Sequence, residues 1–230
     1  MTIRKLLLLV SLCISAPLRA DTIAVIGTGN VGMALGTEFA QQGHTIVYGS
    51  RSPLGLKALD LAKKTDGNAS TASPANAAAR AQIVVLAVPG MVVEEVIQGL
   101  GDLSGKIVID VTNPLVMDEP LHFSYGVQSS NGVIVQAAAP DALVVKAFNT
   151  ISWQSMIDPE SSDGPVSVPI VGNDSVAKEK VASMAKAMGL KPIDLGPIEV
   201  SHWTEYGVVI ALNNKFSDRK NFELVFRETE

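Results

Sequence analysis

The chain has 230 residues, of which 47% are hydrophobic and 18% charged, and its formal net charge is -5. Ordinary soluble chains carry about 25% charged residues, so this composition excludes a disordered protein and a long coiled coil and allows a large core. The acidic balance argues against a protein that coats nucleic acid or an anionic membrane surface, and no nucleic-acid partner is expected. A single cysteine excludes an internal disulfide framework, and three scattered histidines show no metal-ligand spacing. We therefore expect no metal site.

The first twenty residues have the layout of a secretory signal peptide. Two basic residues, Arg4 and Lys5, precede an apolar stretch over residues 6–16, and small or helix-breaking residues follow up to Ala20. The stretch is shorter than the about 20 apolar residues that span a bilayer. We therefore expect residues 1–20 to be removed, which would place a mature chain without a transmembrane span in the periplasm or outside the cell. An uncleaved leader, with a cytoplasmic or membrane-anchored protein, is the alternative.

From residue 21 onward, short apolar runs rich in β-branched residues alternate with segments of helical periodicity, which is typical of a parallel sheet covered by helices on both faces. The sequence also predicts two insertions without regular secondary structure, around residues 117–131 and 151–165. The predicted elements, in chain order, are a strand at 22–27, a helix at 30–42, a strand at 45–48, a helix at 54–64, a helix at 74–81 capped by Ser73, a strand at 83–88, a helix at 91–100, a strand at 107–111, a helix near Ile134, strands at 143–148 and 166–171, a helix at 174–188, an edge strand at 192–195 and a helix at 202–212.

A glycine motif joins the first predicted strand to the first predicted helix. It reads Gly27, Thr28, Gly29, Asn30, Val31 and Gly32, a G-x-G-x-x-G pattern. In this position the first glycine permits the tight turn, the second lets the backbone approach a pyrophosphate, and the third lets the helix pack close to the strand. The helix N-terminus then offers unpaired N–H groups to phosphates. The motif predicts a bound dinucleotide.

The residues after the second predicted strand indicate which dinucleotide it is. Enzymes that prefer NAD place an acidic residue there for the ribose 2'-hydroxyl, whereas this chain has Ser50, Arg51 and Ser52. An arginine forms paired, charge-assisted hydrogen bonds to a phosphate, and the two hydroxyls add donors. These residues favour NADP(H), although a solvated arginine in a loop is the alternative.

Two further strand ends are expected at the same edge of the sheet, where ligands bind in doubly wound folds. Ala87, Val88 and Pro89 end the third of the predicted central strands, and Asn113 follows the fourth. The apolar residues are suited to pack on the cofactor, and the Asn113 amide is suited to bind its ribose or carboxamide. Each pattern is also compatible with a proline that simply ends a strand.

Seven motifs in order, GTGNVG, GSR, AVP, TNPL, VVKAFNT, VGND and DLGPIE, resemble the NADP oxidoreductases that depend on coenzyme F420, a deazaflavin. They are also similar to the NADPH-binding domain of six-transmembrane metalloreductases. The resemblance implies an α/β, Rossmann-like, doubly wound and mainly parallel sheet, with an NADP-binding domain at 21–195 and a short helical C-terminal extension at 196–230. It implies NADP(H) as one redox partner and a flavin or coenzyme F420 as the second. It places Gly27, Thr28, Gly29, Asn30 and Val31 at the pyrophosphate, Ser50 and Arg51 at the 2'-phosphate, Ala87, Val88, Pro89 and Asn113 around the ribose and nicotinamide, and Ala147, Phe148 and Asn149 behind the ring.

The acceptor side is less defined, because His202 and Trp203 stand where relatives usually have an arginine. The polar residues that we consider for contact with the acceptor are Lys146, Asn149 and His202. Lys146 follows two apolar residues and is also compatible with an exposed strand end. His202 and Glu205 have the spacing of a solvated surface pair. An aromatic wall of Trp153, Phe148 and Trp203 is a further possibility, the alternative being that these rings belong to the core.

The sequence therefore predicts an NADP(H)-dependent oxidoreductase that transfers hydride between NADPH and a flavin, deazaflavin or similar small acceptor, with no catalytic residue assigned and a possible homodimer. Hydride chemistry belongs to the cofactors, so no acid/base constellation is required of the protein. A non-enzymatic NADP(H) sensor or a partner-dependent electron donor is the alternative. Hydroxyacid dehydrogenases and pyrroline-5-carboxylate reductases have a similar first domain but add a large helical one, for which too few residues follow. The string at 213–215 is a weak match to their catalytic lysine helix.

Overall fold

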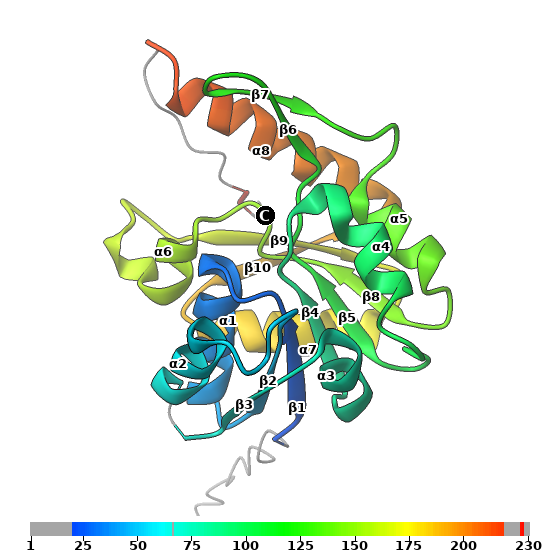
Figure 1. Ribbon diagram of the computed structural model, residues 1–230. Coiled ribbons are helices and arrows are strands. Elements are labelled where there is room, and N and C mark those ends of the chain that lie inside the picture. The colour runs from blue at the N-terminus through cyan, green and yellow to red at the C-terminus, as the bar shows by residue number, and fades with distance from the viewer. Residues whose placement is uncertain (1–19, 66, 219–225, 228–230) are drawn as a thin grey trace, which may run out of the picture.

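A computed structural model describes residues 20–65, 67–218 and 226–227 (Figure 1). The predicted signal peptide lies outside these residues, except for Ala20. No helix within the described ranges is long and apolar enough to cross a membrane.

The centre of the fold is an eight-stranded sheet in the order β10-β9-β8-β5-β4-β1-β2-β3. The first strand lies inside the sheet and the chain winds outward in both directions, which is the doubly wound arrangement that the sequence predicts. Every neighbouring pair is parallel except β8 and β9. The strands are β1 (Thr22–Ile26), β2 (Thr45–Gly49), β3 (Ala69–Ala72), β4 (Ile83–Leu86), β5 (Ile107–Asp110), β8 (Leu143–Lys146), β9 (Ser167–Gly172) and β10 (Lys191–Gly196).

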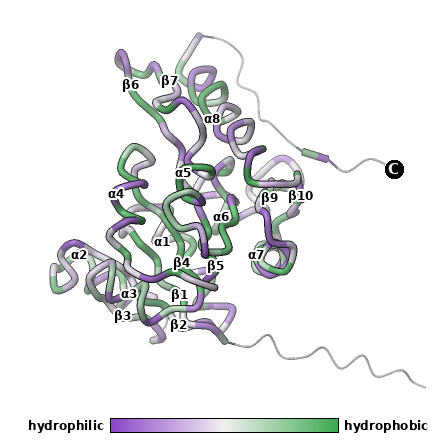
Figure 2. Tube along the Cα trace, turned by 90° about the vertical axis from the view of Figure 1, so that its right-hand side faces the viewer, coloured by the Kyte–Doolittle hydropathy of each residue, from purple (hydrophilic) through white to green (hydrophobic). Residues whose placement is uncertain are grey.

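Helices cover both faces of this sheet, which explains why its strands show no alternation of polar and apolar residues. Successive side chains of β1 point to opposite faces of the sheet and enter different core clusters. Ile23 and Val25 belong to the cluster formed with α1 (Asn30–Gln41), α2 (Leu56–Lys64) and α7 (Ser175–Ala187). Ala24 and Ile26 belong to a cluster formed with three further helices. Those helices are α3 (Pro74–Arg80), α4 (Val93–Gln98) and α5 (Asn131–Ala138). The central strands β4 and β5 are accordingly hydrophobic along most of their length (Figure 2).

Side-chain caps fix the start of several helices. The Ser73 hydroxyl accepts a hydrogen bond from the Asn76 backbone N–H at 3.4 Å, as the sequence predicts for the start of α3. The Asp174 carboxylate accepts from the Ala177 N–H at 2.7 Å at the start of α7. Such caps satisfy N–H groups that have no partner within the helix.

The two segments predicted as irregular insertions contain regular structure. The first forms an antiparallel hairpin of β6 (Leu115–Glu119) and β7 (His122–Tyr125), and the second contains α6 (Trp153–Ile157) and the 3-10 turn η2 (Pro159–Ser161). The prediction of irregular structure is wrong here because each element is short and is stabilised by packing on distant parts of the chain, α6 on α1 and β7 on α8 (Ser201–Lys215).

Three further differences concern elements that the sequence patterns did not resolve. Strand β3 has the sequence ASTA, too short and too small in side chains to stand out, and it pairs with the edge of β2. The helix predicted at 91–100 begins as the 3-10 turn η1 (Gly90–Val92) before α4. Strand β9 runs antiparallel to β8, with Lys146 opposite Val171.

The hairpin and α8 form a separate layer above the carboxyl ends of the parallel strands (Figure 1). The Asn213 side chain of α8 accepts a hydrogen bond from the Phe123 N–H and donates one to its carbonyl, both at 2.7 Å. Tyr125 of β7 stacks on Tyr206 of α8 with ring centroids 4.0 Å apart. Helix α8 follows the 3-10 turn η3 (Ile198–Val200) and falls within the segment that the sequence assigns to an extension. The division of the chain into domains stays a prediction.

Candidate nucleotide-binding site

The glycine motif lies between the end of β1 and the start of α1, at the edge of the sheet where β4 also ends. Gly27 has a φ of +119°, a conformation that side chains rarely adopt, and a Cβ there would collide with the Ala87 carbonyl oxygen. A Cβ on Gly32 would collide with the Gly27 carbonyl oxygen, so Gly32 lets α1 pack directly on the end of β1. The two outer glycines are therefore required by the backbone itself.

Gly29 differs from these two glycines, because an added Cβ would meet no heavy atom within 4 Å. It is the N-cap residue of α1 and its backbone is extended, and no side chain caps the helix. The first N–H groups of α1 thus have no partner within the helix. An uncapped N-terminus of a twelve-residue helix behind an open glycine is suited to hold a phosphate group.

Arg51 lies one strand away, directly after β2. The Gly27 N–H donates to the Gly49 carbonyl at 3.1 Å, which joins the glycine motif to the end of β2. The Ser50 hydroxyl accepts from the Ser52 N–H at 3.1 Å and so orders this turn. Arg51 is exposed and takes part in none of the ion pairs formed within the described residues. Its guanidinium is therefore available to an anionic ligand.

A cleft of about 310 Å³ continues from the glycine motif along the ends of β4 and β5. Five of the residues that the sequence predicts as cofactor contacts line it: Val31, Ala87, Val88, Pro89 and Asn113. The sequence analysis did not assign the other four lining residues to the cofactor site, namely Gly90, Val111, Thr112 and Leu115. The strand ends thus meet at one edge, as expected of a doubly wound sheet.

Two hydrogen bonds join Asn113, in the loop after β5, to Asn149, in the loop after β8. The Asn149 amide donates to the Asn113 side-chain oxygen at 3.0 Å, and the Asn113 amide donates to the Asn149 carbonyl at 2.9 Å. Asn149 is buried, and its side-chain oxygen has no hydrogen-bond partner among the residues that the structure describes. A buried acceptor without a partner costs about 1–3 kcal/mol, so this oxygen is suited to receive a donor from a ligand.

Ala147 and Phe148, which the resemblance places behind the nicotinamide ring, belong to the hydrophobic core. They are 0% and 1% exposed, and Phe148 packs edge-on against Phe39 with centroids 6.2 Å apart. Phe148 also has a φ of +63°, which is unusual for a residue with a side chain. These two residues support the floor of the site from within the core and do not line the 310 Å³ cleft.

A buried cluster of charges lies behind the cleft. The Lys146 ammonium is 2.9 Å from an Asp110 carboxylate oxygen and 2.7 Å from a Glu205 carboxylate oxygen, and it also donates to the Thr112 carbonyl. All three charged side chains are 0% exposed. The structure therefore excludes Lys146 as an exposed strand end. Because its three N–H bonds are taken by these acceptors, Lys146 is also not free to contact an acceptor molecule.

The cluster joins five elements of the fold, namely β5, β7, β8, α5 and α8. Glu205 of α8 accepts hydrogen bonds from the Asn131 N–H at 3.1 Å, the Gly132 N–H at 3.2 Å and the Tyr125 hydroxyl at 2.6 Å. Burial and the neighbouring Glu205 carboxylate raise the pKa of the Tyr125 hydroxyl, which keeps it protonated as a donor. Glu205 thereby caps the N-terminus of α5 and fixes the hairpin to α8.

Sequence reasoning did not find Glu205, Asn131, Thr112, Tyr125 or Asp110 as parts of this site. One signal was present: Asp110 and Lys146 end two apolar strands, and a charged residue inside a buried strand requires a partner. No local pattern pointed to Glu205, which is 59 positions beyond Lys146 and reaches it only through the packing of α8.

The predicted surface pair of His202 and Glu205 is wrong, because Glu205 points into the protein and His202 bonds through Nδ1 to the Glu199 carbonyl at 2.8 Å. The aromatic wall is not assembled either. Phe148 is core, Trp153 packs against the core, and Trp203 is 69% exposed beside His202.

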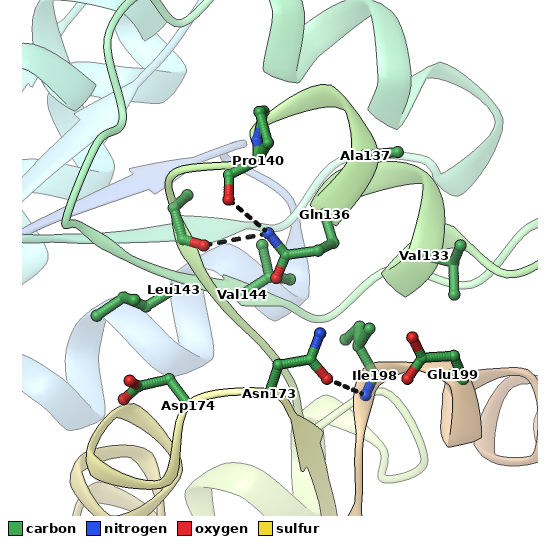
Figure 3. Close-up of a pocket in the computed structure, with 11 residues that line it drawn as sticks. Val133, Gln136, Ala137, Pro140, Leu143, Val144, Asn173, Asp174, Ile198 and Glu199 are labelled. Carbon is green, nitrogen blue, oxygen red and sulfur yellow. Dashed lines mark hydrogen bonds between the residues drawn. The ribbon is translucent and has the colours of Figure 1, made fainter.

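A larger cavity of about 490 Å³ lies at the opposite end of β8, away from the glycine motif (Figure 3). Leu143 and Val144 at the start of β8 line it, together with α5, Asn173 and Glu199. The Gln136 amide there donates to the carbonyls of Ala139 and Ala142, both at 3.2 Å. Ligands of doubly wound sheets bind at the carboxyl ends of the parallel strands, which is where the smaller cleft lies and the larger cavity does not.

Comparison with known proteins finds oxidoreductases of the two kinds that the sequence motifs resemble. Residues 22–114 match the family model described as NADP oxidoreductase coenzyme F420-dependent. Metalloreductase STEAP3 of Rattus norvegicus is 31% identical over 185 residues, which are 79% of this chain and 35% of the relative. The F420-dependent NADP reductase of Methanothermobacter marburgensis is 27% identical over 214 residues, 86% of this chain and 93% of the relative. This chain thus spans about a third of the length of the metalloreductases that it matches.

Among solved structures, a candidate F420-dependent NADP-reductase from Arthrobacter sp. fb24 superposes with a TM-score of 0.80 at 29% identity, over 90% of this chain and 100% of that chain. The likeness confirms the predicted Rossmann-like fold with a mainly parallel sheet. The matches confirm both predicted resemblances. Over residues 22–114, the chain is similar to the family of coenzyme F420-dependent NADP oxidoreductases.

Proposed function

We propose that this chain is an NADP(H)-dependent oxidoreductase that transfers hydride between NADPH and a small acceptor of the flavin or deazaflavin class. The observation that carries the proposal is the open N-terminus of α1 behind Gly29, with the exposed Arg51 one strand away, which forms no ion pair within the described part of the chain. A pyrophosphate at the helix and a 2'-phosphate at Arg51 match these two features.

The residues of this chain fit the cofactor in three places. The N–H groups at the start of α1 would bind the pyrophosphate, and Arg51 with the Ser50 and Ser52 hydroxyls would bind the 2'-phosphate. The cleft along Ala87, Val88, Pro89 and Asn113 would receive the ribose and nicotinamide. When bound, NADPH supplies a hydride, which is two electrons and one proton, and leaves as NADP⁺.

The protein's part in this reaction is to position two flat molecules against each other. The Asn113–Asn149 pair fixes the orientation of the loop after β5, and the buried oxygen of Asn149 supplies an acceptor at the end of β8. Acceptors of the flavin class are favoured because they take a hydride directly and draw the accompanying proton from solvent, so the chain needs no dedicated acid.

Mixing the purified chain with NADPH and a panel of FMN, FAD, riboflavin and a deazaflavin tests the proposal. NADPH oxidation, followed by its absorbance, is expected with at least one member of the panel. NADPH binding without oxidation in any mixture would contradict the enzyme and favour the alternative, a sensor or a partner-dependent electron donor. The absence of NADPH binding would contradict both.

We also propose that the chain is exported and cut after Ala20, on the basis of the layout of residues 1–20. N-terminal sequencing of the protein from fractionated cells tests this. A start at Asp21 in the periplasmic or secreted fraction is expected, and an intact leader in the cytoplasmic or membrane fraction would contradict export.

A further inference from the structure

The buried cluster of Asp110, Lys146 and Glu205 behind the cleft carries a net negative charge. Its hydrogen bonds indicate the ionisation state of each of the three groups. Glu205 accepts four donors: Lys146 and the Gly132 N–H on one oxygen, and the Tyr125 hydroxyl and the Asn131 N–H on the other. Only an ionised carboxylate accepts at all of these positions. Glu205 is therefore an anion.

Asp110 accepts three donors, and within the described residues no acceptor faces it that could take a carboxyl proton, so we also treat it as an anion. One oxygen accepts from the Thr112 N–H at 2.9 Å and from the Thr112 hydroxyl at 2.7 Å, and the other accepts from Lys146 at 2.9 Å. Lys146, with three acceptors for its three N–H bonds, is the ammonium form. Two carboxylates and one ammonium leave one formal negative charge inside the protein.

A single residue, Thr112, separates this charged cluster from the cleft. Thr112 lines the cleft and bonds to both Asp110 and Lys146. Gly90 also lines the cleft, and its carbonyl accepts a hydrogen bond from the Asn131 amide at 3.0 Å. The same amide donates to the Thr112 hydroxyl at 2.8 Å. The positive end of α5 offsets part of the Glu205 charge, by about half an elementary charge at most. The cluster stays net negative toward the cleft.

A buried charge acts over a longer distance than a solvated one, because little solvent screens it. The two forms of the cofactor that the proposed function assigns to this cleft differ by one positive charge on the nicotinamide ring. We propose that the Asp110–Lys146–Glu205 cluster raises the affinity of the cleft for NADP⁺ relative to NADPH, and so favours hydride donation by the bound cofactor. This inference rests on the proposed function.

The test is the ratio of the dissociation constants for NADP⁺ and NADPH, measured by titration without any acceptor. Glu205→Gln removes the charge with little change of shape and is expected to weaken NADP⁺ relative to NADPH by about three- to tenfold. Asp110→Asn removes the second carboxylate through different partners and is expected to shift the ratio in the same direction. It keeps the test decisive if Glu205→Gln does not fold.

Two control variants separate charge from structure. Tyr125→Phe deletes one donor to Glu205 without changing any charge, so it is expected to lower stability and leave the ratio unchanged. Glu199→Gln makes the same substitution at an exposed position outside the cluster and is expected to change neither quantity. An unchanged ratio in a folded Glu205→Gln or Asp110→Asn variant would overturn the inference. A wild-type chain that binds neither NADP⁺ nor NADPH would instead overturn the proposed function.

Discussion

Asp110 and Lys146 stand opposite each other in register at the carboxyl ends of the parallel strands β5 and β8, and their side chains form an ion pair of 2.9 Å that is closed to solvent. A pair at this position fixes the two strand ends from which the loops of the site emerge. It also fixes α8, because Glu205 bonds to the same ammonium.

Lys146→Met is expected to destabilise the chain by about 3–5 kcal/mol, because it leaves two buried carboxylates without their cation. Urea unfolding measures the free energy of unfolding. Lys186→Met, the same substitution at an exposed position on α7, is expected to change it by less than about 0.5 kcal/mol. Similar losses in the two variants would mean that the buried cation contributes nothing specific.

Arg51→Ala is expected to weaken NADP(H) about 10- to 100-fold and NAD(H) hardly at all, because charge-assisted hydrogen bonds of about 1.5–3 kcal/mol to the 2'-phosphate are lost. Titration of the four nucleotides gives the dissociation constants. Lys57→Ala removes an exposed positive charge from the neighbouring helix α2 and serves as the control for general electrostatics. Equal weakening of NADP(H) and NAD(H) by Arg51→Ala would remove the assignment of the 2'-phosphate site.

The glycine motif allows a matched pair of substitutions. Gly32→Ala is expected to cost about 1–3 kcal/mol of stability, because its Cβ collides with the Gly27 backbone. The Cβ of Gly29→Ala meets no non-neighbouring heavy atom of the described residues within 4 Å, so stability is expected to stay within about 0.5 kcal/mol. NADP(H) affinity is expected to fall about tenfold or more, because the methyl group occupies the approach of the pyrophosphate. Thermal or urea unfolding and nucleotide titration of both variants check this. Full affinity in Gly29→Ala would show that the phosphates bind elsewhere.

The stability of the chain is expected to fall as the pH decreases below about 6.5, because burial, with a smaller contribution from the Lys180 cation, lowers the pKa of His44. The folded state favours neutral His44, whose Nδ1 accepts from the Asp21 N–H at 3.0 Å. Its contribution is therefore complete above the pKa of the unfolded chain and is lost as the unfolded state takes up a proton, with a slope of at most about 1.4 kcal/mol per pH unit.

Urea unfolding at a series of pH values measures this slope. His44→Asn keeps an acceptor for the Asp21 N–H but does not titrate, so the decline below about pH 6.5 is expected to become shallower. His122→Asn, at a side chain that is 59% exposed, is expected to retain the wild-type decline. An unchanged slope in His44→Asn would assign the pH dependence to other groups.

Much of the site was predictable from the sequence because it depends on short, local patterns. The order of strands and helices, the turn at Gly27 and the close packing at Gly32 each follow from a few neighbouring residues. The meeting of Val88, Pro89 and Asn113 at one edge follows from the rule that parallel strands share a carboxyl end. The hairpin and α6 were not predictable in this way, because neither has enough apolar periodicity and both are stabilised by distant partners.

The sequence by itself determined the doubly wound sheet, the glycine motif and the position of Arg51, because backbone geometry and periodicity are encoded within about ten residues. Only the tertiary structure decided that Lys146 is buried, that Glu205 faces it and not His202, and that Phe148 belongs to the core. The first two depend on how α8 and the ends of β5 and β8 pack together, and the third on the packing of Phe148 against Phe39 of α1. A charged side chain can be buried only where a partner of opposite charge arrives. For Lys146 these partners are Asp110 on the neighbouring strand and Glu205 on a helix, 59 positions further along the chain.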